Sequence, residues 1–248
     1  MDHLLEAIET RVSRRSYIDT PLKPADVEAL QALVDKYNGE EDLNMRLVVG
    51  NGDAFLNFRK TYGFFSGVQN YLALVGDAKD FIETEKNGYF GELIVLEATA
   101  RGLGTCWVGG TFDRHATPIE LVGTQSVPCV ITIGYVEPEL SAREKTIKRI
   151  THRGTPKTVD EMTRLDEPIP GWFYGGMKAV QKAPSAINRQ PVIFTLKDGT
   201  VTAAVENSDA ERIAYDLGIA KLHFSIGAGG GSWEFGNGGM FSRTIHDT

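Results

Sequence analysis

The sequence has 248 residues, of which 42% are hydrophobic and 24% are charged. These proportions are typical of a globular protein with a well-filled core, and they exclude disordered, collagen-like and coiled-coil chains. The net charge of −7 argues against general attraction to nucleic acid or an anionic membrane, and no apolar run reaches the roughly 18 to 20 residues that span a bilayer.

The start of the chain and its cysteines favour a cytoplasmic protein. Residues 1–16 begin with Met-Asp and contain no continuous apolar core, which argues against a signal peptide. Cys106 and Cys129 form no CxxC pair and have no histidine cluster nearby, so neither a disulfide framework nor a zinc site is predicted. We expect a protein that acts on a small molecule, with neither nucleic acid nor membrane as a partner.

Hydrophobic spacing predicts the elements of the first half. Residues 2–12 favour a helix that is interrupted by the basic cluster Arg14-Arg15-Ser16. A second helix begins at Pro24 and ends at Asn38-Gly39. Two short strands follow at residues 46–50 and 71–77, and a mostly apolar helix follows at 90–101. A glycine-rich connection at 102–110 then leads to a further strand at 127–136.

The second half predicts a similar series of elements. Residues 141–170 carry a basic stretch with little apolar periodicity and are typical of a linker. A short helix from residue 171 stops before Pro184, because the residue before proline is disfavoured in helices. A hairpin follows at residues 192–206, and a helix follows at 209–227. A glycine-rich loop at 227–233 ends in a tryptophan.

Helix, glycine-rich loop and tryptophan thus occur twice in the same order, about 127 residues apart. This pattern predicts an internal duplication within one domain, residues 1–248. The two degenerate half-copies would cover about 1–140 and 171–248, joined by the basic linker 141–170.

Three clusters could bind a ligand. Arg14, Arg15 and Ser16 could chelate a phosphate at a helix end, although the cluster alone fits a solvated basic turn better. Residues 183–191 combine small side chains, a serine and the amides of Asn188 and Gln190, which suit the polar edge of a heteroaromatic ring better than they suit an ordinary turn.

The glycine-rich run 104–110 leaves room for a cofactor edge beside backbone N–H groups, or forms a tight turn. Arg149, His152 and Arg153 could close on a phosphate or remain solvated linker charges. The sequence contains no metal-ligand spacing, GxSxG elbow or Walker A loop, so no catalytic side chain is predicted. A flavin would supply its own reactive atoms.

Together these clusters resemble the nitroreductase family over nearly the whole chain. The family has an RRSxR-like phosphate motif, an APSxxNxQP turn, a GLGxxW-like loop and a later basic arm. Here they correspond to Arg14-Arg15-Ser16, residues 183–191, residues 102–110 and residues 148–153. The APSAINRQP match is the most specific of the four.

The order of the motifs departs from the family. The APSxxNxQP turn is missing near residues 35–46 and comes in the second half instead. In the usual homodimer the two subunits share each flavin site, so the resemblance implies a fused pair with one complete site, acting as a monomer or weak homodimer.

The resemblance implies an α+β sandwich, with a mainly antiparallel sheet flanked by helices, that binds FMN. Arg14 and Ser16 would contact the phosphate, with Arg15 nearby and Arg153 as a further contact. The ring or ribityl chain would be lined by Pro184, Ser185, Ala186, Asn188 and Gln190. The flavin edge near N5 would be passed by Val108, Gly109 and Gly110. Ile18 departs from the family, whose members often carry Arg or Lys there.

The implied reaction is hydride transfer in two steps, from NADH or NADPH to FMN and then to a nitroaromatic or quinone-like acceptor. Two alternatives stay open. One is a specialised flavoenzyme of the dehalogenase or flavin-breakdown type, because fold does not fix chemistry. The other is a non-catalytic or degenerate FMN binder. Cys106 is expected to be a buried small residue.

Overall fold

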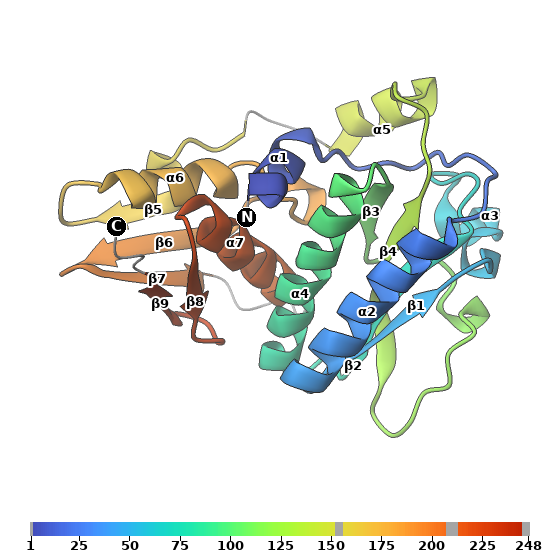
Figure 1. The fold of residues 1–248 in the computed structure, drawn as a ribbon, viewed down its shortest axis with the longest axis horizontal. Coiled ribbons are helices and arrows are strands. Elements are labelled where there is room, and N and C mark those ends of the chain that lie inside the picture. Colours follow the sequence, from blue (N-terminus) through green and yellow to red (C-terminus); the bar gives the residue numbers. More distant parts are fainter. Residues whose placement is uncertain (1, 152–155, 207–212, 245–248) are drawn as a thin grey trace. The chain divides into compact units, whose positions relative to one another are not determined.

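The computed structural model describes residues 2–151, 156–206 and 213–244. The chain divides into two compact units (Figure 1). Unit 1 comprises Met1–Glu9, Lys79–Leu93 and His152–Thr248, and unit 2 comprises Thr10–Ala78 and Ile94–Thr151. The units interleave along the chain, whereas the sequence predicted two successive halves. The predicted duplication stays a prediction.

Unit 2 contains a four-stranded antiparallel sheet in the order β1-β2-β4-β3. Its strands are β1 (Asn44–Val48), β2 (Asn70–Gly76), β3 (Gly104–Val108) and β4 (Ser126–Gly134). The central strand β2 is buried at every position. Its alternate residues therefore face two separate apolar layers.

One face of this sheet packs against an aromatic layer. Tyr71, Ala73 and Val75 of β2 join a core cluster that also contains Phe55 and Phe112. The ring centroids of Phe55 and Tyr71 are 5.9 Å apart, in an edge-to-face arrangement that aromatic pairs prefer. This layer comes from the segment 52–68 and from the region after β3, which the sequence left without a predicted structure.

The helices of unit 2 include α2 (Pro24–Glu41), which contacts β1, and the C-terminal part of α4 (Phe81–Ala100). Short helical segments are η1 (Asp53–Phe55), α3 (Phe58–Thr61), η2 (Arg114–Ala116) and α5 (Ala142–Thr151). Helix α2 continues past the predicted stop at Asn38-Gly39. It ends where Asp42 adopts the left-handed conformation, φ 55°, and donates its N–H to the Asn38 carbonyl.

Unit 1 contains a five-stranded sheet in the order β5-β6-β7-β9-β8. The strands are β5 (Thr163–Leu165), β6 (Val192–Lys197), β7 (Thr200–Val205), β8 (Gly231–Trp233) and β9 (Met240–Arg243). All neighbours pair antiparallel except β5 and β6. The predicted hairpin is β6-β7, and its turn places Asp198 and Gly199 at positive φ, 49° and 72°, which suits a two-residue turn.

The helices of unit 1 are α1 (Asp2–Thr10), the first part of α4, α6 (Gly171–Val180) and α7 (Ile213–Gly227), with short turns η3 (Asp160–Met162) and η4 (Ala186–Asn188). Phe224 of α7 lies at the centre of an aromatic core, 5.0 Å from the ring of Phe194 on β6. Helices α6 and α7 approach closely because Gly175 faces the Gly227 carbonyl, where an added Cβ would be 2.6 Å from its oxygen.

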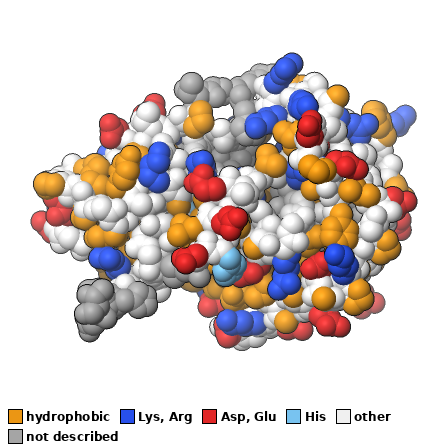
Figure 2. Space-filling model, turned by 45° about the horizontal axis from the view of Figure 1, so that its top comes forward, with side chains coloured by type: hydrophobic (Ala, Val, Ile, Leu, Met, Phe, Trp, Pro, Cys, Tyr) orange, Lys and Arg blue, Asp and Glu red, His pale blue; other side chains and the backbone are white. Residues whose placement is uncertain are grey.

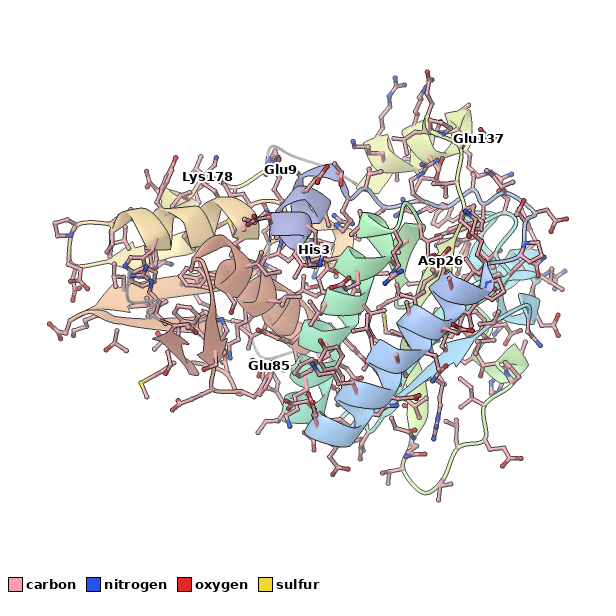
Figure 3. The ribbon with its side chains drawn as sticks, in the orientation of Figure 1. His3, Glu9, Asp26, Glu85, Glu137 and Lys178 are labelled. Carbon is pink, nitrogen blue, oxygen red and sulfur yellow. The ribbon has the colours of Figure 1, made fainter. Side chains whose placement is uncertain are left out.

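A buried ion pair joins α4 to α7 within unit 1. Lys221 donates to Glu85, which Figure 3 labels on α4, and both side chains are fully buried. Lys221 also donates to the carbonyl of Glu234 at 2.9 Å and to that of Gly236 at 3.0 Å. Removing either charge would therefore leave the other buried and unpaired, which is strongly destabilising.

The α+β class with a mainly antiparallel sheet, predicted from the resemblance, is confirmed. Besides the end of α2, two further local predictions were wrong. Residues 104–108, expected in a connecting loop, form β3 because β4 offers a partner strand that the local glycines do not reveal. The expected linker 141–170 contains α5 and β5, and α5 begins at a capping box formed by Ser141 and Glu144.

Candidate functional site

The Arg14-Arg15-Ser16 motif lies on extended backbone in unit 2, not at a helix end. Helix α1 ends at Thr10, and isolated bridges then pair Ser13 with Thr105 and Ser16 with Ser66. The Arg14 N–H donates to the Thr105 carbonyl at 2.8 Å. The predicted position at the end of a helix was therefore wrong, because these pairings are made with strand and loop residues far along the chain.

Glycines let this segment lie close to the sheet of unit 2. An added Cβ at Gly104 would come within 3.0 Å of the Arg14 Cγ, and one at Gly134 within 2.9 Å of the Tyr17 ring. At Gly67 a Cβ would clash with the Tyr17 carbonyl oxygen, and φ is 67°. These three positions fix the path of the motif.

Three donors of the motif converge on one carboxylate oxygen. Glu144 Oε1 accepts from Arg14 Nε at 3.1 Å, from the Arg15 N–H at 2.7 Å and from the Ser16 N–H at 3.2 Å. Arg14 also donates to the Glu139 carbonyl at 3.2 Å. The side chains of Arg14 and Glu144 are 7% and 1% exposed, so the motif forms a buried anion-binding group that an internal carboxylate occupies.

Electrostatics favour the charged form of Glu144 strongly. Burial raises the pKa of this carboxyl group, but donors from Arg15, Ser141 and Arg14 outweigh burial and lower the pKa to about 2. The carboxylate is therefore ionised throughout the physiological range.

The other predicted phosphate contacts are distributed as follows. Ser16 Oγ lies 3.0 Å from Ser141 Oγ. The Arg15 side chain is half-buried and, among the described residues, enters no hydrogen bond or ion pair. Ile18 is an apolar side chain, 36% exposed, so this position supplies no basic group to a phosphate. Arg149 lies exposed on α5, while His152 and Arg153 lie outside the described residues.

The predicted flavin-edge loop follows β3. Val108 is buried, Gly109 is half-buried and Gly110 is exposed. Arg114 fixes this loop by donating to the Gly109 carbonyl at 2.7 Å and to the Val127 carbonyl at 3.1 Å. Sequence reasoning missed Arg114, because its partners are backbone carbonyls that no side-chain pattern marks.

The second cluster, residues 183–191, lies in unit 1, and its turn at residues 184–190 is conformationally unusual. Ile187, Asn188 and Gln190 all have positive φ, at 48°, 58° and 46°. Asn tolerates this region, but a β-branched residue such as Ile187 is strained there. Strain of this kind persists only where surrounding contacts hold the backbone in place.

Two side chains hold the turn. Ser185 Oγ accepts the Gln190 N–H at 2.9 Å, and Asp216 of α7 accepts the Ala186 N–H at 3.0 Å. The side-chain amide of Gln190 is engaged at both ends, since it donates to the Gln181 carbonyl and accepts from the Lys157 N–H. Its predicted contact with flavin stays a prediction.

Asn188 differs from Gln190. Its side chain is half-buried and, within the described residues, has no hydrogen-bond partner. Pro184 and Ser185 line a small pocket with Asp216, and its cavity volume is about 10 Å³, room for about one water molecule. Sites that enclose a drug-sized ligand usually span roughly 300 to 1,000 Å³, so this pocket alone is too small for an isoalloxazine.

Burial raises the pKa of Asp216 from its ordinary value of 3.8 to about 7, although the Ala186 N–H and the Arg189 charge act in the opposite direction. A carboxyl group that titrates near neutrality beside a candidate binding turn is a functional-site indicator. Sequence reasoning missed Asp216, whose position on a buried helix gave no signal. It also missed Glu144, although Ser141 and Glu144 have the spacing of a capping box.

Cys106 is 2% exposed, as expected, and burial raises the pKa of its thiol. Such a thiol is protonated and unreactive at neutral pH.

Across residues 2–151, 156–206 and 213–244, no group of three or more His, Cys, Asp or Glu side chains could hold a metal ion. In the same part of the chain, every helix is too short or too polar to cross a membrane. Acidic and basic side chains are interspersed on the face shown in Figure 2.

The prediction that Arg14 and Asn188 contact the same flavin joins residues of two different units and stays a prediction. What the structure provides is one cluster in each unit. The first is an anion-binding group at residues 14–16, and the second is a strained turn in which no described residue bonds to the Asn188 amide.

Comparison with known proteins places the chain in a family. A protein from Thermotoga maritima, described as a putative nitroreductase, shares the fold with a TM-score of 0.64 and 22% identity, over 96% of this chain and 91% of that chain. A nitroreductase with bound FMN from Desulfitobacterium hafniense has a TM-score of 0.46 and 15% identity, over 59% of this chain and 96% of that chain. No curated protein matches. The family profile described as "Putative TM nitroreductase" matches residues 3–228, so the chain belongs to this nitroreductase family, as its motifs predicted.

Proposed function

We propose that the chain is an FMN-dependent oxidoreductase that transfers hydride from NADH or NADPH to a nitroaromatic or quinone-like acceptor in two half-reactions. Family membership supports the reaction class. The observation that carries the cofactor is the convergence of three donors of residues 14–16 on one anionic oxygen. When bound, FMN supplies a ring that accepts and releases hydride, and the chain binds and orients it.

The phosphate of FMN fits the chemistry of the motif. Backbone N–H groups and a guanidinium form charge-assisted bonds to phosphate oxygens, and Arg15 adds a second guanidinium that no described residue engages. Ser16 contributes a hydroxyl group. In this proposal Arg14, Arg15 and Ser16 bind the phosphate, and Arg153 remains a proposed further contact.

In this proposal the ring and ribityl chain lie against the surface of the turn of unit 1. Pro184, Ser185 and Ala186 have small side chains that allow close approach, and Asn188 offers an amide for the polar edge of the ring. Val108, Gly109 and Gly110 are proposed to pass the flavin edge near N5. The role of these residues is to position the ring, because no side-chain acid or base is required.

The test is an anaerobic titration of the purified full chain loaded with FMN. Bleaching of the flavin absorbance by NADH or NADPH, followed by its return on adding a quinone or nitroaromatic, supports the proposal. A protein that binds no FMN overturns it. A protein that binds FMN but is not reduced by either nucleotide is a passive binder, and this outcome overturns the enzymatic part.

Two variants test the contacts separately. Arg15→Gln should weaken FMN binding roughly 10- to 100-fold, because a charge-assisted bond to phosphate is lost. The control Arg46→Gln removes an exposed charge of the same unit and should leave affinity unchanged. Asn188→Gly should weaken binding of both FMN and riboflavin, whereas Asp198→Gly, at another left-handed position of unit 1, should not.

A further inference from the structure

The donors of the phosphate motif already have an anionic partner within the chain. Glu144 Oε1 takes one bond from the Arg14 guanidinium and one from each of the N–H groups of Arg15 and Ser16. Each N–H group makes one strong bond, so a phosphate oxygen and this carboxylate oxygen cannot both use the same donors. Two anions at this distance would also repel each other.

Capping of α5 does not explain the whole arrangement. In the capping box, Glu144 Oε2 accepts the Ser141 N–H at 2.8 Å, and the Glu144 N–H donates to Ser141 Oγ at 3.2 Å. That motif needs only one carboxylate oxygen. The other oxygen binds a segment 128 to 130 residues away in sequence.

We propose that Glu144 is a specificity-determining residue that competes with the phosphate group of a flavin for the donors of Arg14, Arg15 and Ser16. The flavin part of this inference rests on the proposed function, but the phosphate part does not. A flavin phosphate binds these donors only after the Glu144 carboxylate leaves them. Riboflavin, which lacks the phosphate, does not meet this competition.

The flanking groups allow such an exchange. Ser16 and Ser141 place two hydroxyl groups 3.0 Å apart beside the carboxylate. A phosphate ester carries close to two negative charges and three strong acceptor oxygens, so it can engage these hydroxyls together with the donors that Glu144 releases. Arg14 stays neutralised in both states, since one anion replaces the other.

The variant Glu144→Gln tests this competition, and its melting temperature without phosphate shows how far the loss of the buried Arg14–Glu144 pair destabilises the fold. Glutamine keeps an oxygen that accepts the Arg15 and Ser16 N–H groups, and it also serves in capping boxes. It removes the negative charge and one of the two acceptor oxygens, so either the Ser141 N–H or the donors of Arg14, Arg15 and Ser16 lose their acceptor. The matched control is Glu139→Gln, whose carboxylate is 91% exposed on the same segment and pairs with Lys145 at 4.0 Å.

The first measurement is the affinity for FMN and for riboflavin, by quenching of flavin fluorescence. In Glu144→Gln the ratio of the riboflavin to the FMN dissociation constant should rise about tenfold or more over wild type, because the phosphate no longer displaces a charged competitor. Glu139→Gln should leave the ratio at the wild-type value. An equal ratio in all three proteins overturns the inference while leaving the proposed function intact.

The second measurement needs no flavin. Inorganic phosphate is titrated at constant ionic strength against chloride, and the melting temperature is followed for each protein. Phosphate should raise the melting temperature of Glu144→Gln by about 3 °C or more, and that of wild type and Glu139→Gln by clearly less. If phosphate stabilises Glu144→Gln but neither FMN nor riboflavin binds, the competition is supported and the proposed function is overturned. Equal phosphate effects in all three proteins overturn the competition.

Discussion

Replacing Asp216 by asparagine should stabilise the protein above neutral pH, although the change removes a buried hydrogen-bonding carboxylate. Asp216 accepts the Ala186 N–H, and it is 6% exposed. An asparagine oxygen can accept the same N–H. The difference lies in the charge of Asp216, which burial opposes and which no ion pair within the described residues compensates.

The pH dependence follows from the direction of the shift. The pKa of Asp216 rises from 3.8 in the unfolded chain to about 7 in the folded protein. The folded state therefore holds the proton more tightly, so stability is greatest below pH 3.8 and falls as pH rises towards 7. At about 1.4 kcal/mol per pKa unit, the loss between pH 5 and pH 8 is at most about 3 kcal/mol. Asp216→Asn removes this loss.

The assay is urea unfolding at pH 5, 6, 7 and 8, in a Trp107→Phe background so that emission comes from Trp172 and Trp233 of unit 1. The free energy of unfolding of Asp216→Asn minus that of the parent should grow by about 1 to 3 kcal/mol from pH 5 to pH 8. The control Asp166→Asn, exposed in the same unit, should show no such growth. A difference independent of pH would refute the reasoning.

Three further predictions concern stability, measured by urea unfolding. Lys221→Met should cost about 3 to 5 kcal/mol because Glu85 is left buried without its cation, and adding Glu85→Gln should recover much of the loss. Ile187→Asn should stabilise by about 0.5 to 1 kcal/mol, since Ile187 is 61% exposed and asparagine tolerates its φ of 48°. Gly104→Ala should cost about 1 to 3 kcal/mol, because its Cβ would clash with Val136 Cγ1 and come within 3.0 Å of Arg14 Cγ. Gly109→Ala, where a Cβ meets nothing within 4 Å, should cost less than about 1 kcal/mol, and equal costs would contradict the steric argument.

Elements with their own local signal could be predicted from the sequence. Pro24 and the apolar spacing after it marked the start of α2, and the Asp198-Gly199 turn marked the β6-β7 hairpin. Elements that depend on a distant partner could not. Strand β3 forms because β4 pairs with it, and the Arg14 segment is extended because Thr105 and Ser66 pair with it.

The candidate site shows the same division. The donors of residues 14–16 and the amide of Asn188 were recognisable as motifs, because their residue types are characteristic. The carboxylates that hold these two segments were not, since Glu144 on α5 lies 128 to 130 residues from Arg14, Arg15 and Ser16, and Asp216 on α7 lies 30 residues from Ala186, whose N–H it accepts. The left-handed backbone at Ile187 was also hidden, because isoleucine rarely adopts it.

Glu144 and Asp216 perform the same structural task under opposite electrostatic conditions. Each accepts backbone N–H donation from a candidate binding motif. At Glu144 the donors of Arg15, Ser141 and Arg14 outweigh burial, whereas burial dominates at Asp216. Their pKa values are therefore about 2 and about 7. A change of pH between 6 and 8 alters the charge beside the turn at residues 184–190 and leaves the carboxylate at residues 14–16 ionised. Any pH dependence of flavin binding in this range that arises from these two carboxyl groups must therefore come from Asp216, so it should disappear in Asp216→Asn and persist in Glu144→Gln.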